Sequence, residues 1–368
     1  MSDEVAIIVG TRPELIKMSP VIRACERDSI EYSLIHTGQH YSENLDGVFF
    51  EQLDLPEPTV HLGVGSGTHG AQTGEMLTSL EQVLLRREPS SVLVQGDTNS
   101  VLAGALAASK LDTELGHVEA GLRSHDRTMP EEINRIVGDH VADQLFAPTE
   151  QSRENLLNEG IPASKIHVTG NTVVDALYHH RHIAAEESDA LDRYGLSPGR
   201  YTLLTAHRAE NVDDPRRFQS LLDGVGQAAR SVGLPVIYPV HPRAKERIEQ
   251  HRLAVPDPIR CVAPLSYLDF LHLEDNADLI LTDSGGVQEE ACILGVPCVT
   301  LRDTTERPET VSIGSNRLCG VEPTAIVEAV ETMRAVDRTW ENPFGDGNAA
   351  ARILRSLGVV VRNRGWAR

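Results

Sequence analysis

The stretch Leu279-Ile-Leu-Thr-Asp-Ser-Gly-Gly-Val-Gln-Glu-Glu-Ala291 holds the transition that decides the fold. Its apolar residues end at Asp283, which is typical of a short buried strand. A turn at Ser284, Gly285 and Gly286 follows, and a helix is expected over 287–294. A strand, a glycine pair and a helix N-terminus leave unpaired backbone N–H groups, so this pattern predicts an anion site at the turn.

Two carboxylates after the glycines favour a nucleotide as the ligand. Glu289 and Glu290 are expected in the first helical turn, where a carboxylate suits the helix dipole but would repel an adjacent phosphate. One of them is therefore better suited to accept hydrogen bonds from sugar hydroxyls, such as those of a ribose. The alternative is an ordinary strand-to-helix turn, in which Ser284 caps the helix and the glycines serve only the geometry.

Length and composition indicate a globular protein of about two domains. The chain has 368 residues, and its 40% hydrophobic but only 4% aromatic content predicts aliphatic cores. No apolar run approaches the ~20 residues of a membrane span, and we expect no signal peptide before the first strand. Five scattered cysteines without C-x-x-C spacing are expected to be reduced core residues of a cytoplasmic protein (Cys25, Cys261, Cys292, Cys298 and Cys319).

The charge balance argues against nucleic acid as the main partner. Lys and Arg number 34 and Asp and Glu 54, which gives a net charge of −20. Nearly all the basic residues are Arg. Strong acidity with few lysines suggests work in high salt, where the Debye length falls to ~3 Å at 1 M. We therefore expect a source that lives in high salt; ordinary acidic solubility with a GC-rich codon bias is the alternative.

Cations follow the first strand, which is expected over 5–9. Gly10-Thr-Arg-Pro-Glu14 comes next, with Pro13 suited to the first position of a helix. Arg12 and Lys17 would then lie near the carboxyl end of a parallel strand, where anions are captured. A solvated helix face is the alternative for both residues.

Three acids are expected near the same edge of the first sheet. Asp97 follows one strand after a glycine turn, and Glu119 ends the next strand. Glu131 lies where a helix begins at Pro130. Each alone is typical of a helix cap, but three acids in one crevice favour proton-transfer chemistry.

Two other motifs receive no functional assignment. Gly65-x-Gly67-x-x-Gly70 matches a dinucleotide fingerprint, but we expect no strand before it and see no suitably spaced acid after it. It is interpreted as a mobile loop before a helix over 70–87. The His179-His180-x-His182 cluster could bind a metal but is interpreted as a solvent-facing helix end.

The second half repeats the alternation of strands and helices from Tyr201 onward. His207 follows its first strand and could serve as an acid, a base or a phosphate donor. His241-Pro-Arg243 is another cationic strand end. We place the domain boundary near residue 170, and the alternation predicts two Rossmann-like sheets facing a cleft.

Seven ordered motifs resemble the non-hydrolysing UDP-N-acetylglucosamine 2-epimerases. The resemblance runs from residue 5 to about 358, and the segment 41–70 with Met129 is most similar to archaeal members. The motifs are Gly10-Thr-Arg-Pro-Glu, Gln95-Gly-Asp-Thr, His117-Val-Glu-Ala-Gly-Leu-Arg, Pro130-Glu-Glu-Ile-Asn-Arg, His207-Arg-x-Glu-Asn, Thr282-Asp-Ser-Gly-Gly-Val-Gln-Glu-Glu and Arg302-Asp-Thr-Thr-Glu-Arg-Pro-Glu.

The resemblance implies a glycosyltransferase-B-like fold whose C-terminal helix crosses back to the first domain. The domains are then 1–170 completed by 349–368, and 171–348. The implied activity is the interconversion of UDP-GlcNAc and UDP-ManNAc for glycan biosynthesis, without metal or nicotinamide. We expect a cytoplasmic homodimer with no nucleic-acid or membrane partner.

The resemblance also implies a role for individual residues. Catalytic roles fall on Asp97, Glu119, Glu131 and His207. Substrate contacts fall on Arg12 and Lys17, on Ser284, Gly285 and Gly286 for the diphosphate, on Glu290 for the ribose, and on Arg243, Phe270 and Arg307 elsewhere on the UDP side. Ser42, after Tyr41, lacks the amide through which bacterial members respond to a second substrate molecule, so that regulation is in doubt.

The chemistry itself restricts the mechanism. The C2 proton has no adjacent carbonyl, so UDP must leave from C1 as that proton is lost, giving 2-acetamidoglucal. Four alternatives stay open: a hydrolysing epimerase that releases free ManNAc, an epimerase for a 2,3-diacetamido uronic acid sugar, a glycosyltransferase of the same fold, and a UDP-sugar sensor without catalysis.

Overall fold

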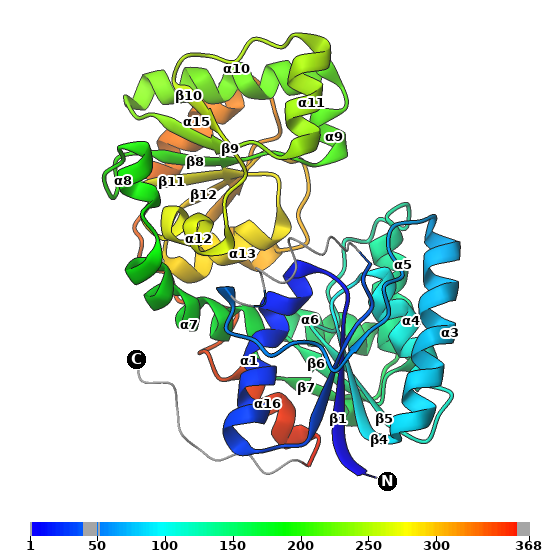
Figure 1. The fold of residues 1–368 in the computed structure, drawn as a ribbon. Helices are drawn as coiled ribbons and strands as arrows, with labels where there is room; N and C mark the ends of the chain where they lie inside the picture. The colour runs from blue at the N-terminus through cyan, green and yellow to red at the C-terminus, as the bar shows by residue number, and fades with distance from the viewer. Residues whose placement is uncertain (1, 40–49, 51, 359–368) are drawn as a thin grey trace. The chain divides into compact units, whose positions relative to one another are not determined.

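The computed structural model describes residues 2–39, 50 and 52–358. Its contacts divide the chain into two units, Met1–Tyr178 with Phe344–Arg368, and His179–Pro343. Each unit holds one parallel sheet flanked by helices (Figure 1), which confirms the predicted α/β class. The sequence also predicts an amphipathic helix over 44–53; most of that segment, together with Tyr41 and Ser42, lies outside the described residues.

The first unit contains a seven-stranded sheet. Its strand order is β3-β2-β1-β4-β5-β6-β7, and every neighbouring pair is parallel. The strands are β1 (Ser2–Val9), β2 (Tyr32–His36), β3 (Val60–His61), β4 (Pro89–Gln95), β5 (Glu114–Val118), β6 (Gln144–Ala147) and β7 (Ile166–Val168). The direction of the strand order reverses between β1 and β4, and α/β sheets bind ligands at the carboxyl ends beside such a reversal.

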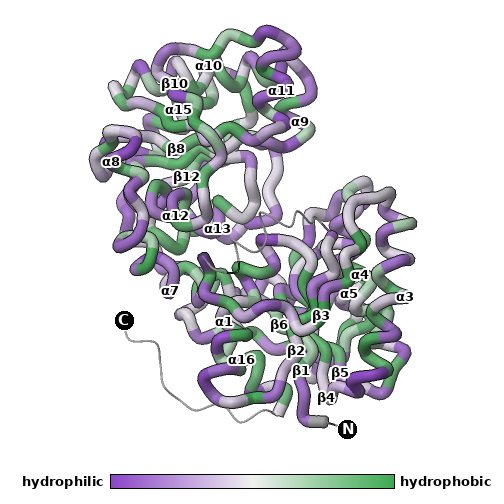
Figure 2. The backbone as a smooth tube through the Cα atoms, in the orientation of Figure 1, coloured by the Kyte–Doolittle hydropathy of each residue, from purple (hydrophilic) through white to green (hydrophobic). Residues whose placement is uncertain are grey.

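The helices of this unit bury the apolar residues of the sheet. Residues Val5 to Val9 of β1 are at most 1% exposed, as expected of a parallel strand covered on both faces. The helices are α1 (Arg12–Asp28), α3 (His69–Arg87), α4 (Asn99–Ala108), α5 (Pro130–Val141), α6 (Glu150–Asn158), α7 (Thr172–Glu187), which continues into the second unit, and α16 (Ala349–Ser356). Along α3 the tube alternates between hydrophilic and hydrophobic residues (Figure 2), the pattern of an amphipathic helix.

The last described helix, α16, belongs to the first unit. It packs against α1, and the Asp175 carboxylate accepts hydrogen bonds from the backbone N–H groups of Ala349 and Ala350, both at 3.1 Å. The N–H of Asn171 also donates to the carbonyl oxygen of Phe344 at 2.7 Å. The expected return of the C-terminal helix to the first domain is therefore confirmed.

The second unit contains a six-stranded parallel sheet in the order β10-β9-β8-β11-β12-β13. Its strands are β8 (Thr202–Thr205), β9 (Val236–Pro239), β10 (Ile259–Val262), β11 (Leu279–Thr282), β12 (Cys298–Thr300) and β13 (Asn316–Leu318). Its helices are α8 (Ala190–Tyr194), α9 (Ala209–Val212), α10 (Pro215–Val232), α11 (Pro242–His251), α12 (Tyr267–Asp275), α13 (Gly285–Leu294), α14 (Pro308–Ser312) and α15 (Pro323–Arg334). The strand order reverses between β8 and β11.

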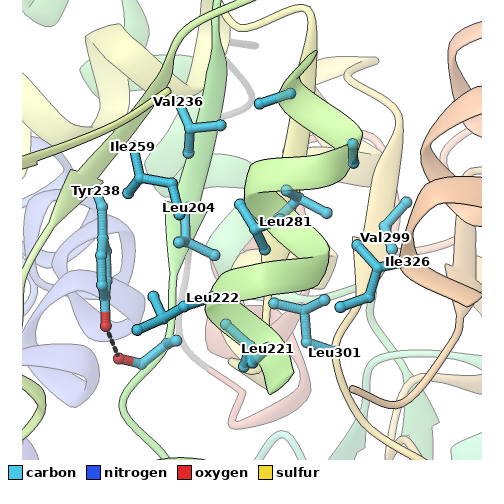
Figure 3. Packing of buried hydrophobic residues seen from close by; sticks show 14 of the residues in the cluster. Leu204, Leu221, Leu222, Val236, Tyr238, Ile259, Leu281, Val299, Leu301 and Ile326 are labelled. Atoms are coloured by element: carbon cyan, nitrogen blue, oxygen red, sulfur yellow. Dashed lines mark hydrogen bonds between the residues drawn. The ribbon is translucent and has the colours of Figure 1, made fainter. Parts of the chain in front are cut away.

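An aliphatic core joins α10 and α15 to one face of the second sheet (Figure 3). Leu221 and Leu222 of α10 pack toward Leu204 and Leu281 of the central strands, and all four are at most 1% exposed. The buried Tyr238 hydroxyl donates to the carbonyl oxygen of Ala206 at 2.7 Å, the dashed line in Figure 3. This core holds the strands whose carboxyl ends carry the polar residues described below.

Three expectations from the sequence are wrong in whole or in part. Strand β3 does precede the Gly65-x-Gly67-x-x-Gly70 loop. The sequence did not indicate it because a strand of two residues is too short to show an alternating pattern. The histidine cluster faces solvent only in part, because His182 is exposed but His180 is fully buried and lies edge-on to Tyr267. Cys261 is exposed because β10 is an edge strand, although all five cysteines are free as expected.

Within the described ranges, no helix is long and apolar enough to span a membrane.

Candidate active site

Glu119 lies at the carboxyl end of β5 in a strained conformation. Its backbone φ is 69°, in the left-handed region that residues other than glycine rarely adopt. Three donors hold the carboxylate: the Lys17 ammonium at 2.6 Å, the Asn171 amide at 3.3 Å and the Gln95 amide. The side chain is only 5% exposed. A strained acid fixed by three donors is typical of a functional site.

Asp97 lies two residues beyond β4, the strand beside β5. One of its oxygens accepts a forked pair of hydrogen bonds from Arg135, from Nε at 3.0 Å and Nη2 at 2.7 Å. The third nitrogen of Arg135 donates to Glu132 at 2.6 Å. The Asp97 side chain keeps 35% of its surface exposed, so it can be reached by a ligand.

The third predicted acid, Glu131, is not joined to these contacts. It is exposed on the first turn of α5, whereas its neighbour Glu132 is buried and pairs with Arg135. Burial alone would raise the pKa of Glu132, but the amides of Ser124 and His125 and the Arg135 guanidinium lower it below its usual value. Within this unit, the acid that lies with Asp97 is therefore Glu132, and Arg135 joins the two. Neither Glu132 nor Arg135 was predicted as a site residue from the sequence.

A second layer of charged groups supports the ends of β4 and β5. His117 donates from Nε2 to the carbonyl oxygen of Gly96 at 2.8 Å, and its Nδ1 lies 2.7 Å from the Asp139 carboxylate. Arg123 pairs with the other Asp139 oxygen at 2.7 Å. Burial opposes a charged imidazole, yet Asp139 and the Gly96 carbonyl raise the pKa of His117. This pairing fixes the turn that carries Asp97.

The first turn of α1 is organised by a buried acid. Glu14 accepts hydrogen bonds from the backbone N–H groups of Gly10 and Thr11, at 2.7 and 2.8 Å, and from the Thr98 hydroxyl at 2.6 Å. Burial raises its pKa to about 7. Arg12 begins α1 and is exposed, while Lys17 reaches Glu119. Glu14 thus joins the β1 and β4 turns on either side of the reversal in strand order.

In the second unit, His207 and Asp283 lie together at the ends of the central strands β8 and β11. Asp283 is fully buried and accepts hydrogen bonds from the backbone N–H groups of His207 and Arg208, both at 3.0 Å, and from Asn211 at 3.2 Å. Its carboxylate also lies 3.2 Å from His207 Nδ1. Burial alone would raise the pKa of Asp283, but these donors lower it. The His207 side chain is 42% exposed.

The predicted anion site forms the N-terminus of α13. The helix begins at Gly285, two residues earlier than expected, and Ser284 is its N-cap without a capping side-chain hydrogen bond. A Cβ built on Gly286 would meet nothing closer than Ser284 Oγ at 3.9 Å. The fold therefore does not need a glycine there, which counts against a purely geometric role for the pair.

A cation and a buried acid stand beside this N-terminus. A Cβ on Gly285 would lie 3.9 Å from Arg208 Nη2 and 3.4 Å from Glu306 Oε2. Arg302 holds Glu306 through two hydrogen bonds of 2.9 Å. Although burial opposes ionisation, Arg302 and Arg208 lower the pKa of Glu306 to about 2. Arg208 lies within a quoted motif, but sequence reasoning gave it no role.

The two carboxylates of α13 lie one turn later than expected, because the glycines themselves are helical. Glu289 is fully buried and pairs with Arg307 at 2.7 Å, so Arg307 faces an internal acid. Glu290 is half-buried. Arg243 is paired with Asp213, with Nε 3.0 Å from its carboxylate, and Phe270 packs against the buried cluster beneath α12.

Across the described part of the chain, no group of three or more His, Cys, Asp or Glu residues could hold a metal ion. Each unit instead gathers acids, cations and a histidine at the carboxyl ends of parallel strands. Two Rossmann-like sheets with such sites define the class of enzymes that bind nucleotide sugars on a glycosyltransferase-B-like fold.

Comparison with known proteins identifies the family. Residues 23–358 match the family model described as UDP-N-acetylglucosamine 2-epimerase, and the chain belongs to this family. The UDP-N-acetylglucosamine 2-epimerase of the archaeon Methanocaldococcus jannaschii is 52% identical over 96% of this chain and 98% of its own.

One solved structure and one further relative bear on the substrate. A crystal structure of the M. jannaschii enzyme in complex with UDP-GlcNAc and UDP has a TM-score of 0.89 and covers 96% of this chain and 99% of its own, at 52% identity. The UDP-2,3-diacetamido-2,3-dideoxy-D-glucuronate 2-epimerase of Pseudomonas aeruginosa is 42% identical, over 96% of this chain and 99% of its own.

Proposed function

We propose that the protein is a UDP-N-acetylglucosamine 2-epimerase that interconverts UDP-GlcNAc and UDP-ManNAc. The observation that carries this proposal is Glu119, a strained acid held by Lys17, Gln95 and Asn171 at the end of β5. It is supported by membership of the family and by the extent of the match to the archaeal enzyme.

The reaction proceeds by elimination and re-addition. A base takes the proton from C2, the C–H electron pair forms the C1=C2 double bond, and the C1–O bond breaks so that UDP leaves as an anion. The product alkene is 2-acetamidoglucal. A proton then adds to the opposite face of C2 while a diphosphate oxygen attacks C1. Asp97, Glu119 and Glu131 divide the two proton transfers among them, since each face of C2 needs its own group.

The leaving diphosphate needs positive partners. The N–H groups at the start of α13 and the Ser284 hydroxyl bind it in this proposal, with the Arg208 guanidinium beside Gly285. His207, fixed through Nδ1 by Asp283, presents Nε2 for proton transfer to or from the substrate. Arg12 and Lys17 supply further cations.

The rest of the nucleotide is assigned to the later part of the second unit. Glu290 accepts hydrogen bonds from the ribose hydroxyls, since Glu289 is already paired with Arg307. Arg307, Phe270 and Arg243 contribute on the UDP side, Arg307 by fixing the helix that carries Glu290. We further propose that the enzyme acts as a cytoplasmic homodimer, which size-exclusion chromatography with light scattering would test.

The direct test is incubation with UDP-GlcNAc and analysis of the products by NMR. We expect UDP-ManNAc to accumulate to a fixed ratio with UDP-GlcNAc, and the same ratio to be reached from UDP-ManNAc. Free ManNAc with UDP as the end products would instead indicate a hydrolysing enzyme. No change in the sugar would contradict the proposed activity.

A second candidate substrate is favoured by the 42% identity to the Pseudomonas aeruginosa enzyme named above. UDP-2,3-diacetamido-2,3-dideoxy-D-glucuronate would undergo the same chemistry at C2, with different groups at C3 and C6. Comparison of kcat/KM for the two UDP-sugars decides between them, and we expect the larger value for UDP-GlcNAc.

The charge of −20 leads to a further proposal, that the protein is adapted to high salt as in a halophilic archaeon. Salt at 1 M shortens the Debye length to ~3 Å and screens the repulsion among surface carboxylates. The melting temperature is therefore expected to rise between dilute and molar NaCl. A melting temperature that is flat or falls over this range would leave codon bias as the explanation of the composition.

A further inference from the structure

A buried acid that accepts no hydrogen bond from the described residues lies on α12. Glu274 is 1% exposed, and no backbone N–H, amide or cation in these parts of the chain donates to either of its carboxyl oxygens. An uncompensated buried charge is costly, and buried polar groups nearly always find partners. Such a residue calls for a physical reason to be kept.

Glu290 on the adjacent helix α13 provides that reason. Helices α12 and α13 are in contact, and the two carboxyl side chains are close enough to interact. Burial first, and then the negative charge of Glu290, raise the pKa of Glu274 well above its ordinary value. Two carboxyl groups that share a site repel each other when both are charged, so the pKa of one of them is raised. Glu274 is the more deeply buried of the two and is therefore the one that keeps its proton.

The other titratable groups around Glu274 do not offer a positive charge. Asp275 follows it on α12, Tyr201 immediately precedes β8, and Cys298 begins β12. The Tyr201 hydroxyl donates to the carbonyl oxygen of Leu273. None of these described groups is a cation, and Asp275 is already paired with Arg181 at 2.8 Å. The proton on Glu274 therefore has Glu290 as its acceptor.

We propose that Glu274 is a positioning residue for nucleotide binding, which acts by donating its carboxyl O–H to the carboxylate of Glu290. A neutral carboxyl group has one donor, and a carboxylate has about four acceptor sites. Glu290 would therefore be held ionised in one orientation, with acceptor sites left for both ribose hydroxyls. This inference rests on the ribose-binding role proposed above for Glu290.

The test compares two nearly isosteric variants with two ligands. Glu274→Gln keeps a donor in the amide N–H, whereas Glu274→Leu fills the space without one. UDP carries both ribose hydroxyls, and 2′,3′-dideoxy-UDP carries neither. Isothermal titration calorimetry gives the affinity of each protein for each ligand, and the melting temperature shows whether each variant is folded.

Glu274→Leu is expected to weaken UDP binding about tenfold, the effect of one lost hydrogen bond to a charged group, and to leave 2′,3′-dideoxy-UDP binding unchanged. Glu274→Gln should bind UDP within about threefold of the parent protein. Equal losses for both ligands in Glu274→Leu, or no rescue by Glu274→Gln, would overturn the inference, because a purely packing role predicts them.

Glu290→Ala separates this inference from the function on which it rests. If Glu290→Ala keeps the preference for UDP over 2′,3′-dideoxy-UDP, the ribose role of Glu290 is wrong and the inference falls with it. If Glu290→Ala loses the preference while Glu274→Leu keeps it, the ribose role stands and only the positioning role of Glu274 is overturned.

Discussion

UDP-ManNAc formed by this enzyme in D2O is expected to carry deuterium at C2. The base that removes the C2 proton exchanges it with solvent before the opposite face is protonated. UDP-GlcNAc recovered after the back-reaction should carry the label too. A transient oxidation through bound nicotinamide would usually return the original hydrogen. Mass spectrometry and proton NMR of both sugars measure the label, and product with C2 fully protiated would contradict elimination.

Glu119→Gln is expected to lower kcat by ~10²-fold or more, since a positioned acid or base contributes that much to a rate. The amide cannot take up a proton, which is why kcat should fall. It is nearly isosteric with the carboxylate, so the affinity for UDP should be retained. Glu4→Gln is the matched control, because Glu4 is also a buried acid paired with a cation, Arg87, but lies at the opposite end of β1 from the site. Equal activity of the two variants would remove Glu119 from the proton transfers.

Gly286→Val is expected to weaken UDP binding by ~10²-fold, which corresponds to ~2.7 kcal/mol. The added methyl groups would stand in front of the amides at the N-terminus of α13, and each hydrogen bond to a charged group contributes about 1.5–3 kcal/mol. The unliganded protein should fold normally, because a Cβ at this position meets nothing closer than 3.9 Å. Gly286→Ala should show a smaller loss.

Gly74→Val is the matched control for that experiment. Gly74 also lies in a helix, α3, and a Cβ there would have nothing within 4 Å. Both variants introduce a β-branched residue into a helix, so they share the intrinsic cost of helix propensity. Calorimetric titration with UDP that gives the same affinity for both would show that the N-terminus of α13 does not bind the diphosphate.

Much of the fold could be predicted because its signals are local. The helix expected over 70–87 is α3 (His69–Arg87), and the strand expected over 5–9 forms the apolar buried part of β1 (Ser2–Val9). The sequence analysis did not predict strand β3 or the exposure of Cys261, and both lie on edge strands. Whether a strand lies at the edge of a sheet depends on which other strands pair with it, and the pattern within one segment does not contain that information.

The site was only partly predictable, because its pairings are between distant segments. The pattern placed Asp97 and Glu119 at the carboxyl ends of neighbouring strands, and the structure has them there. The contacts of Lys17 with Glu119 and of Arg135 with Asp97 join residues far apart in sequence, so no spacing reveals them. Glu131 and Glu132 are adjacent acids, and only the register of α5 decides which one is buried.

The closure of the first unit by α16 has a consequence for protein synthesis. The Asp175 carboxylate accepts hydrogen bonds from the amides of Ala349 and Ala350, and α1 packs against α16. Both contacts therefore need residues that follow the second unit in the sequence. The ribosome makes these partners only after the whole second unit, His179–Pro343, has been synthesised. The second unit is therefore synthesised in full before the segment that completes the first unit. A chain that ends just after residue 343 would contain the whole second unit, whereas its first unit would lack α16 and leave part of α1 uncovered.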